Sequence, residues 1–345
     1  MSIITIVGAG MMGSAMSVPA RDNGHTVRLV GTHLDREIIA HARKTGEHLT
    51  MQRRLPEGIA FYQIEALRQA LNGCDLVLCG VSSFGVDWFL DTVVPLIPDR
   101  VPVLAVTKGL LEEQDGTLLP FPSYYQHQTG GRLPFGAIGG PCTSYELADR
   151  RQTCVAFCGE DMRVLQRLKA LLETEYYHIS LSTDVLGVEC AVAMKNAYAL
   201  GVTLAVGLIE KEDGIGCTPA YNPQAALFGQ SVKEMAAVLE HVGAGAGSIV
   251  YGAGDLYVTI FGGRTRKLGT LLGRGIPFPE AIQELSGITL ESVVIANRLI
   301  SAVTKAIQAG TLSDTQFPLL LHVGKLLRGD TNEGIPFARF TDAEM

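Results

Sequence analysis

The sequence is poor in charge and has no excess of basic residues. Lys and Arg number 28 against 35 Asp and Glu, which gives a formal net charge of −7 over 345 residues. A protein that binds bulk nucleic acid carries a basic surface, so no nucleic-acid partner is expected. Charged residues make up 18% and hydrophobic residues 47%. This balance excludes a disordered chain and favours an α/β enzyme with a large buried core.

The sequence also lacks a C-x-x-C pair, and its seven cysteines are an odd number. Both facts argue against a disulfide framework and favour a reducing compartment, so we expect a cytoplasmic protein. Four histidines recur near the N-terminus, namely His25, His33, His41 and His48. Their spacing fits no metal template, so we expect no metal and interpret them as surface residues.

One stretch, residues 190–209, is almost wholly apolar and long enough to span a membrane. Lys195 and Asn196 lie inside it, and a lysine at the centre of a bilayer costs about 2.5–3.5 kcal/mol. No basic cluster flanks the stretch. We therefore expect a buried core helix and no membrane span.

Apolar strand-like runs alternate with helical patterns in the N-terminal half, as in parallel βαβ units. Strands are expected at residues 3–7, 26–30, 75–81, 101–107, 135–139, 153–157 and 176–181. After them the pattern is helical throughout, with helices expected at 184–209, 222–243, from 279, 291–309 and 318–328. The fold class is therefore α/β, with an N-terminal Rossmann dinucleotide-binding domain, 1–182, and an all-helical C-terminal substrate and catalytic domain, 183–345.

A glycine-rich motif, residues 8–13 (GAGMMG), follows the first expected strand and precedes a helical pattern. This is the context that a dinucleotide-binding G-x-G-x-x-G requires. Gly8 permits the tight turn, Gly10 lets the backbone approach a pyrophosphate, and Gly13 allows helix and strand to pack closely. The N–H groups at the helix start attract the anion. The motif predicts NAD or NADP as cofactor.

The second expected strand lacks an acidic residue at its end, where a carboxylate would bind the ribose of NAD. Asp35 lies some residues late, and Arg36 beside it could meet the 2′-phosphate of NADP. The choice between the two cofactors therefore stays open, with the use of NADP allowed.

Two lysines lie where the pattern permits a function. Lys195 is the only charge in residues 190–209, and on a helix it shares an apolar stripe with Ala191 and Ala199. It is either a snorkelling surface residue or a desolvated amine suited to acid–base catalysis. Lys108 follows a buried strand, at the edge where parallel strands face their ligand. It is either a substrate-site lysine or a solvated one.

Two further candidates follow glycines in the C-terminal half. Residues 262–267 (GGRTRK) are typical of a loop that enters a helix, where Arg264 could clamp a phosphate or simply begin the helix. Asp255, within residues 252–256 (GAGDL), is predicted as a loop carboxylate that pairs with a lysine or caps a helix.

In this order, several segments resemble the NAD(P)-dependent glycerol-3-phosphate dehydrogenases, and most of all their archaeal members. They are GAGMMGSA, GVSSFGV, VTKGLLEE, GGPCTSYELA, STDVLGVECAVAMKNAYAL, GAGDLYVT and GGRTRKLG. They span residues 1 to about 330. The resemblance implies a Rossmann domain and a helical substrate domain, an active site in the cleft, and interconversion of sn-glycerol 3-phosphate and dihydroxyacetone phosphate. Because family members are often dimers, it also implies a homodimer.

The resemblance further implies roles for individual residues. Lys195 matches the family's catalytic acid–base, Lys108 and Asp255 match its substrate-site lysine and aspartate, and Arg264 matches its phosphate-binding arginine. The remaining substrate contacts that it implies are Gly140, Cys142, Asn196 and Thr265. The cofactor contacts that it implies are Gly8, Gly10, Met11, Met12, Gly13, Thr32, His33, Ser82, Phe84, Lys108, Ser144 and Glu291.

Two positions depart from the family's pattern. The family commonly has Asn where this chain has Thr265, and Ser or Thr where it has Cys142. Thr265 can still donate a hydrogen bond, but Cys142 is a poor replacement donor. Alternatives to the small phosphorylated substrate named above therefore remain: another phosphorylated polyol or ketose, such as a tetritol phosphate, a 2-keto acid, or dinucleotide sensing without catalysis. Arg264 favours a phosphorylated substrate over a keto acid.

Overall fold

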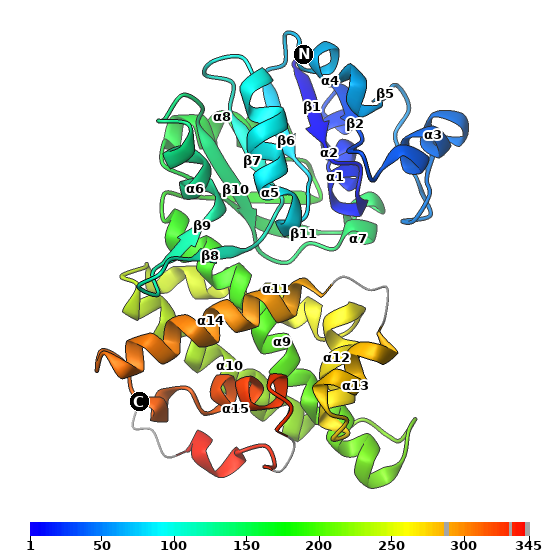
Figure 1. Ribbon diagram of the computed structural model, residues 1–345. Coiled ribbons are helices and arrows are strands. Elements are labelled where there is room, and N and C mark those ends of the chain that lie inside the picture. Colours follow the sequence, from blue (N-terminus) through cyan, green and yellow to red (C-terminus); the bar gives the residue numbers. More distant parts are fainter. Residues whose placement is uncertain (286–289, 331–332, 342–345) are drawn as a thin grey trace. The chain divides into compact units, whose positions relative to one another are not determined.

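The computed structural model describes residues 1–285, 290–330 and 333–341. Its contacts divide the chain into two compact units, Met1–Lys108 with Pro120–Glu189, and Gly109–Leu119 with Cys190–Met345 (Figure 1). The chain thus leaves the first unit directly after Lys108 and returns to it at Pro120. Residues 109–119, which the sequence pattern places in the first domain, group with the second unit.

An eight-stranded sheet forms the core of the first unit, in the order β12-β11-β10-β7-β6-β1-β2-β5. Its strands are β1 (Ile3–Val7), β2 (Thr26–Val30), β5 (Ala60–Tyr62), β6 (Leu76–Cys79), β7 (Val103–Ala105), β10 (Phe135–Gly139), β11 (Thr153–Gly159) and β12 (Tyr177–Ser182). All neighbours are parallel except β10 and β11. The strand order reverses at β1, whose Val7 pairs with Val30 of β2 and Cys79 of β6. Ligands of such sheets bind at this switch point.

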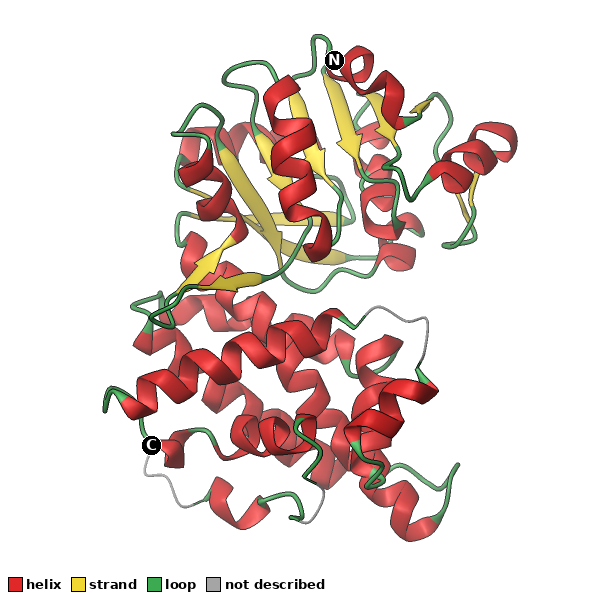
Figure 2. Ribbon diagram, viewed as in Figure 1, coloured by secondary structure: helices red, strands yellow, loops and turns green. Residues whose placement is uncertain are grey.

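Helices surround this sheet (Figure 2). They are α1 (Met11–Ala15), α2 (Ser17–Asp22), α3 (Arg36–Thr45), α4 (Leu67–Leu71), α5 (Val86–Trp88), α6 (Phe121–Gln128), α7 (Ser144–Ala148) and α8 (Met162–Leu172). The Rossmann prediction is therefore confirmed. The antiparallel β11 was not expected: the short connection between β10 and β11 holds only α7, so the chain turns back instead of crossing over.

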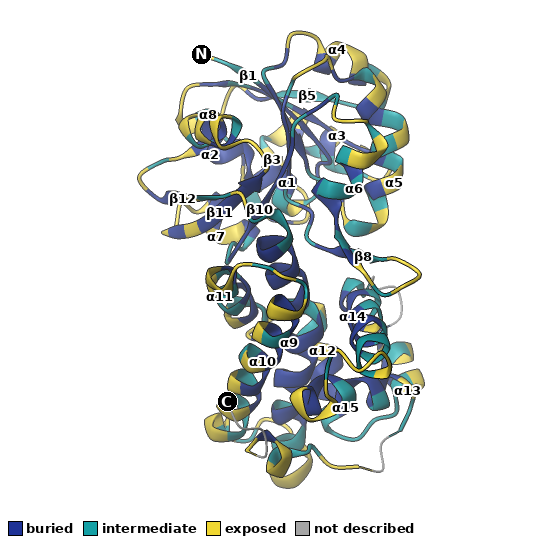
Figure 3. Cartoon of the chain, turned by 90° about the vertical axis from the view of Figure 1, so that its left-hand side faces the viewer, coloured by how far each residue is buried: buried dark blue, intermediate teal, exposed yellow. Residues whose placement is uncertain are grey.

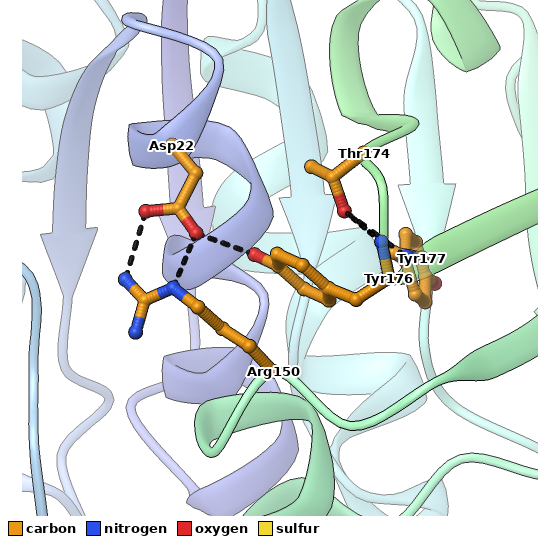
Figure 4. A network of polar contacts seen from close by, with 5 residues as sticks. All are labelled: Asp22, Arg150, Thr174, Tyr176 and Tyr177. Carbon is orange, nitrogen blue, oxygen red and sulfur yellow. Dashed lines mark hydrogen bonds and ion pairs between the residues drawn. The ribbon is translucent and has the colours of Figure 1, made fainter.

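A polar network joins α2 to the chain ahead of β11 and β12 (Figure 4). The Asp22 carboxylate accepts hydrogen bonds from Arg150 Nε at 2.7 Å, Arg150 Nη2 at 2.8 Å and Tyr176 Oη at 2.6 Å. Burial alone would raise the pKa of Asp22, but the bonds from Arg150 and Tyr176 outweigh it and hold this pKa below its usual value. Helix α2 is thereby fixed to the half of the sheet that holds β11 and β12.

We expect Asp22→Ala to lower the free energy of unfolding by about 2 kcal/mol, because charge-assisted hydrogen bonds from two partners are lost. The pKa of Asp22 is lower in the folded state than in the unfolded state, where it is near 3.8. Asp22 therefore adds to the free energy of unfolding above pH 3.8, and this stabilisation disappears as the pH falls through the pKa of the folded state. Urea denaturation at pH 7 and pH 3 measures both effects. Arg163→Ala, on a side chain that is 90% exposed, is the control. Equal losses for both variants would contradict this expectation.

The second unit is built from helices, with one hairpin (Figure 2). Its elements are α9 (Val185–Asp213), α10 (Tyr221–His241), α11 (Ile249–Thr259), α12 (Gly263–Gly273), α13 (Phe278–Glu284), α14 (Glu291–Gln308), α15 (Pro318–Leu327) and the hairpin of β8 (Leu110–Glu112) and β9 (Leu118–Pro120). The Asn-Pro pair at 222–223 predicts that Asn222 caps this helix, but α10 begins at Tyr221, so that prediction was wrong. Pro223 instead lies inside its first turn, where a proline loses no helical bond.

Helix α9 is the central helix of this unit (Figure 3). Asp184 caps it, because its Oδ1 accepts a hydrogen bond from Gly187 N at 2.9 Å. By length and composition α9 could cross a membrane, but 72% of its most apolar window is buried inside the protein. It therefore packs as a core helix, as the interrupting polar residues predict.

Glu234 of α10 is a fully buried carboxylate that caps a second helix. Its Oε1 accepts from Leu319 N at 2.7 Å and its Oε2 from Leu320 N at 2.9 Å, both in the first turn of α15. Gln230 Nε2 donates to the same Oε1 at 2.9 Å. A buried side chain of α10 thus satisfies N–H groups that the start of α15 would otherwise leave unpaired.

Burial raises the pKa of Glu234 to about 7, although the bonds from Gln230, Leu319 and Leu320 act in the opposite direction. Below the pKa of Glu234 in the unfolded chain, about 4.5, this carboxyl group is protonated in both the folded and the unfolded protein. As the pH rises from there through the pKa of the folded state, the free energy of unfolding falls. We expect this group to lower the free energy of unfolding by about 3 kcal/mol between pH 4.5 and pH 8. Glu234→Gln should remove that part of the pH dependence. Urea denaturation measures it, and identical slopes for both proteins would contradict the assignment.

Candidate active site

In the first unit, the glycine motif connects β1 to α1. Each of its three glycines is needed for a different structural reason. Gly8 has a φ of +107°, and a Cβ there would lie 2.6 Å from the Gly80 carbonyl carbon. A Cβ on Gly13 would lie 2.2 Å from Gly8 O, so any side chain would push the helix away. Apart from Gly10 and its two chain neighbours, no described residue has an atom within 4 Å of a Cβ built on Gly10. Gly10 therefore leaves a surface open to a ligand, beside the first-turn residues Met11 and Met12.

The end of β2 is held to the glycine motif by Asp35. Its Oδ2 accepts from Thr32 N at 2.8 Å, Thr32 Oγ1 at 2.9 Å and Ala9 N at 3.0 Å. His33 is exposed and lies edge-on to Trp88, with ring centroids 5.9 Å apart. Arg36 forms an exposed ion pair with Glu65. Asp35 thus shapes the cofactor loop itself, a role that the sequence did not suggest.

Two other predicted cofactor residues follow β6, and one begins α7. Ser82 and Phe84 are both exposed, Phe84 at 56%, in the turn after β6. Ser144 is the first residue of α7 and is buried. All three follow the carboxyl end of a strand, the edge at which dinucleotides bind in this fold.

Lys108 and Gly140 lie together in the first unit, as the predicted substrate contacts require. Lys108 Nζ donates a hydrogen bond to Gly140 O at 2.8 Å. Gly140 has a φ of +104°, a conformation that a residue with a side chain rarely adopts. Cys142 is half-buried two residues further along the same loop. A cation is thereby fixed beside a backbone turn at the end of β7 and β10.

In the second unit, Lys195 and Asp255 form an ion pair. Lys195 Nζ lies 2.6 Å from Asp255 Oδ1, and the two side chains are 16% and 1% exposed. Of the two roles predicted for Asp255, pairing with a lysine is the one that the structure shows, but the prediction that Asp255 lies in a loop was wrong, because it lies in α11. A Cβ on Gly252 would lie 2.5 Å from Ala191 O, so this glycine lets α11 pack directly on α9. Asp255 lies one turn after Gly252 on α11, and Lys195 lies one turn after Ala191 on α9. The close packing therefore brings these two side chains into contact.

The remaining predicted residues of this unit lie at helix starts or on α9. Arg264 and Thr265 are in the first turn of α12, with Arg264 exposed. Asn196 is half-buried next to Lys195, and Glu291 is the first residue of α14. The glycine-rich entry to α12 forms as predicted, with Gly263 at a φ of +81°.

Two of the N-terminal histidines are buried, so their interpretation as surface residues was wrong. His48 is fully buried and His25 is 9% exposed. His48 Nε2 lies 2.8 Å from Ala9 O, within the glycine motif. No periodic signal marks His48, because it lies in β3 (Glu47–His48), a two-residue strand that pairs with the equally short β4 (Arg53–Arg54).

Comparison with known proteins identifies the family. The model described as "NAD-dependent glycerol-3-phosphate dehydrogenase N-terminus" matches residues 3–165, and that of the C-terminus matches residues 184–333. The NADP(+)-dependent glycerol-3-phosphate dehydrogenase of Archaeoglobus fulgidus is 33% identical over 285 residues, which cover 82% of this chain and 83% of the relative. The chain belongs to the NAD-dependent glycerol-3-phosphate dehydrogenase family. The resemblance in its motifs is thus confirmed.

Further relatives of this family agree. The glycerol-3-phosphate dehydrogenase [NAD(P)+] of Shouchella clausii is 26% identical over 297 residues, covering 85% of this chain and 84% of the relative. A glycerol-3-phosphate dehydrogenase structure from Coxiella burnetii shares the fold, with a TM-score of 0.79 at 23% identity, covering 99% of this chain and 98% of that one. The chain is therefore an NAD(P)-dependent oxidoreductase that acts on a CH–OH group.

Proposed function

We propose that the enzyme interconverts sn-glycerol 3-phosphate and dihydroxyacetone phosphate with NAD or NADP. The observation that carries this proposal is the Lys195–Asp255 pair, with Nζ and Oδ1 at 2.6 Å and the carboxylate 1% exposed. An amine held by a buried carboxylate is a suitable proton donor and acceptor for an alcohol–ketone pair. The family membership and the named activity of its relatives support the same reaction.

When bound, the dinucleotide supplies the hydride for C2. Lys195 would hold the proton that the developing alkoxide takes up, and Asp255 would keep its amine in place. Lys108, fixed by Gly140 O, would stabilise negative charge on the substrate. In the oxidative direction the proton returns to Lys195.

The substrate phosphate is assigned to Arg264 and Thr265 at the start of α12. The guanidinium can bind two phosphate oxygens at once, and the N–H groups of the first turn add to the attraction. Holding the phosphate fixes the position of C2 and orients the carbonyl. Asn196 and Cys142 complete the proposed substrate contacts.

The glycine motif fits a dinucleotide, because the space beside Gly10 is open and the first turn of α1 begins there. Thr32, His33, Ser82, Phe84, Ser144 and Glu291 are the proposed further cofactor contacts. Neither cofactor is excluded: Asp35 is engaged with Thr32 and Ala9, while the exposed pair of Arg36 with Glu65 is weak enough to yield to a 2′-phosphate.

The test is loss of absorbance at 340 nm with NADH and then NADPH, against dihydroxyacetone phosphate, a four-carbon ketose phosphate and ketopantoate. We expect the fastest turnover with dihydroxyacetone phosphate, and the preferred cofactor follows from the same assay. Faster turnover of the four-carbon phosphate would mean that Cys142 and Thr265 select a different polyol phosphate. Turnover of ketopantoate alone would overturn the assignment of Arg264.

Two further expectations, on cellular location and oligomeric state, belong to the same proposal. The enzyme is proposed to act in the cytoplasm, as its cysteine pattern predicts, and to form a homodimer, as the resemblance implies. Light scattering coupled to size exclusion measures the mass in solution, and the mass of one chain at micromolar concentration would contradict the dimer.

A further inference from the structure

We propose that His48 is a positioning residue for the dinucleotide, acting through the backbone of the glycine motif. It is the fully buried residue of β3, yet its Nε2 lies 2.8 Å from Ala9 O, 39 residues earlier in the chain. Ala9 stands between Gly8 and Gly10, at the turn where a pyrophosphate would approach the backbone. This inference rests on the proposed function only in requiring that a dinucleotide binds to this motif.

The hydrogen bonds define which ring nitrogen carries the proton. Met51 N donates to His48 Nδ1 at 3.0 Å, so Nδ1 accepts and holds a lone pair. Nε2 must then carry the hydrogen and donate it to Ala9 O. Burial lowers the pKa of His48 and outweighs the Ala9 carbonyl and Asp35, which act to raise it. The lowered pKa keeps the ring neutral. Protonation of Nδ1 would break the bond from Met51.

Both peptide groups of Ala9 are held by side chains from outside the motif's own turn. Ala9 N donates to Asp35 Oδ2 at 3.0 Å. Ala9 O accepts from His48 Nε2 and from Ser14 Oγ, the latter at 3.2 Å. Because a peptide is planar and trans, fixing Ala9 O also fixes the direction of the Gly10 N–H on its far side.

The consequence lies at Gly10, where the surface is open. Gly10 has no Cβ to restrain its backbone, and no described residue beyond its two chain neighbours has an atom within 4 Å of the place where one would be. A glycine loop of this kind is flexible unless its neighbours hold it. His48 therefore pre-organises the loop, so that binding the cofactor costs less conformational entropy.

A simpler interpretation gives His48 only a local role, in which Nδ1 accepts from Met51 N and closes the turn between β3 and β4. Two substitutions separate these roles. The amide of Gln reaches about as far as ring Nε2, so His48→Gln can still donate to Ala9 O. The shorter amide of Asn lies near ring Nδ1, so His48→Asn can accept from Met51 N but cannot reach Ala9.

The experiment measures the dissociation constants of NADH and NADPH by fluorescence titration of the intact enzyme, together with the melting temperature. We expect His48→Asn to weaken binding of the preferred cofactor about tenfold and His48→Gln to stay within about threefold of wild type. The KM of the dinucleotide should rise in parallel in His48→Asn, with the KM of dihydroxyacetone phosphate nearly unchanged. Ser14→Ala, which removes the longer bond to Ala9 O, should weaken binding by about threefold.

His25→Asn is the matched control, since His25 is also buried in the first unit but bonds to Leu171 O and Ser2 N instead of the motif. It should leave both dissociation constants unchanged. Wild-type affinity in His48→Asn, or equal losses in the Asn and Gln variants that follow their melting temperatures, would overturn the proposal. If the wild-type enzyme bound neither dinucleotide, the proposed function would fail instead, and the titration shows this before any variant is made.

Discussion

Replacing Lys195 with methionine is expected to lower kcat by about 10²–10⁴-fold, the usual contribution of a positioned acid–base group. Methionine fills the space of the lysine stem but carries no proton to give to the alkoxide. Stopped-flow measurement of hydride transfer tests this directly, because it separates chemistry from product release. The dissociation constant of the dinucleotide should hardly change, since the glycine motif lies in the other unit.

The variant leaves Asp255 as a buried carboxylate without its lysine, and removing one partner of such a pair costs about 3–5 kcal/mol. A loss of activity could then reflect misfolding. The double variant Lys195→Met, Asp255→Asn removes both charges and should recover most of the stability while staying inactive. Full activity in either variant would remove Lys195 from the mechanism. Recovered activity in the double variant would show that the buried charge, and not the missing amine, caused the loss.

The sheet and most helices could be predicted because their signals are local. The strands of the Rossmann core are short apolar runs bounded by turn residues, and Asp184, Gly310 and Gly329 mark helix ends by capping chemistry. The hairpin 109–119 could not be assigned in this way, because its place depends on distant contacts. Glu112 accepts hydrogen bonds from Ser301 and Lys305 of α14, each at 2.6 Å. The sequence near residue 112 contains no pattern that predicts these partners.

The candidate site also contains residues that local sequence signals predict and residues that depend on distant contacts. The glycine motif was predictable, since each of its glycines has a steric reason that can be read from the strand–turn–helix context. Asp255 was misplaced in a loop, because glycines suggest turns; here Gly252 permits two helix backbones to touch. His48 was interpreted as a surface residue, and its contact with the glycine motif was missed. Its partner Ala9 is 39 residues away, and a lone histidine carries no pattern that points to a backbone carbonyl.

Replacing Arg264 with alanine is expected to raise the KM of dihydroxyacetone phosphate by about 10²-fold, because a charge-assisted bidentate contact to phosphate is worth about 3 kcal/mol. Lys195 and Asp255 lie on other helices, so the proton-transfer groups remain in place. Steady-state kinetics with dihydroxyacetone phosphate, and inhibition by inorganic phosphate, measure the contact. Inhibition by phosphate should weaken together with substrate binding.

Two comparisons make this result specific to the phosphate. Lys267→Ala removes one positive charge from the same helix, also at an exposed position, and should change the KM by less than about threefold if only general attraction is lost. Unphosphorylated dihydroxyacetone lacks the group that Arg264 binds, so wild type and Arg264→Ala should turn it over at similar, low efficiency. An Arg264→Ala enzyme with normal KM would place the phosphate elsewhere. Equal losses on both substrates would mean that Arg264 shapes the site without touching the phosphate.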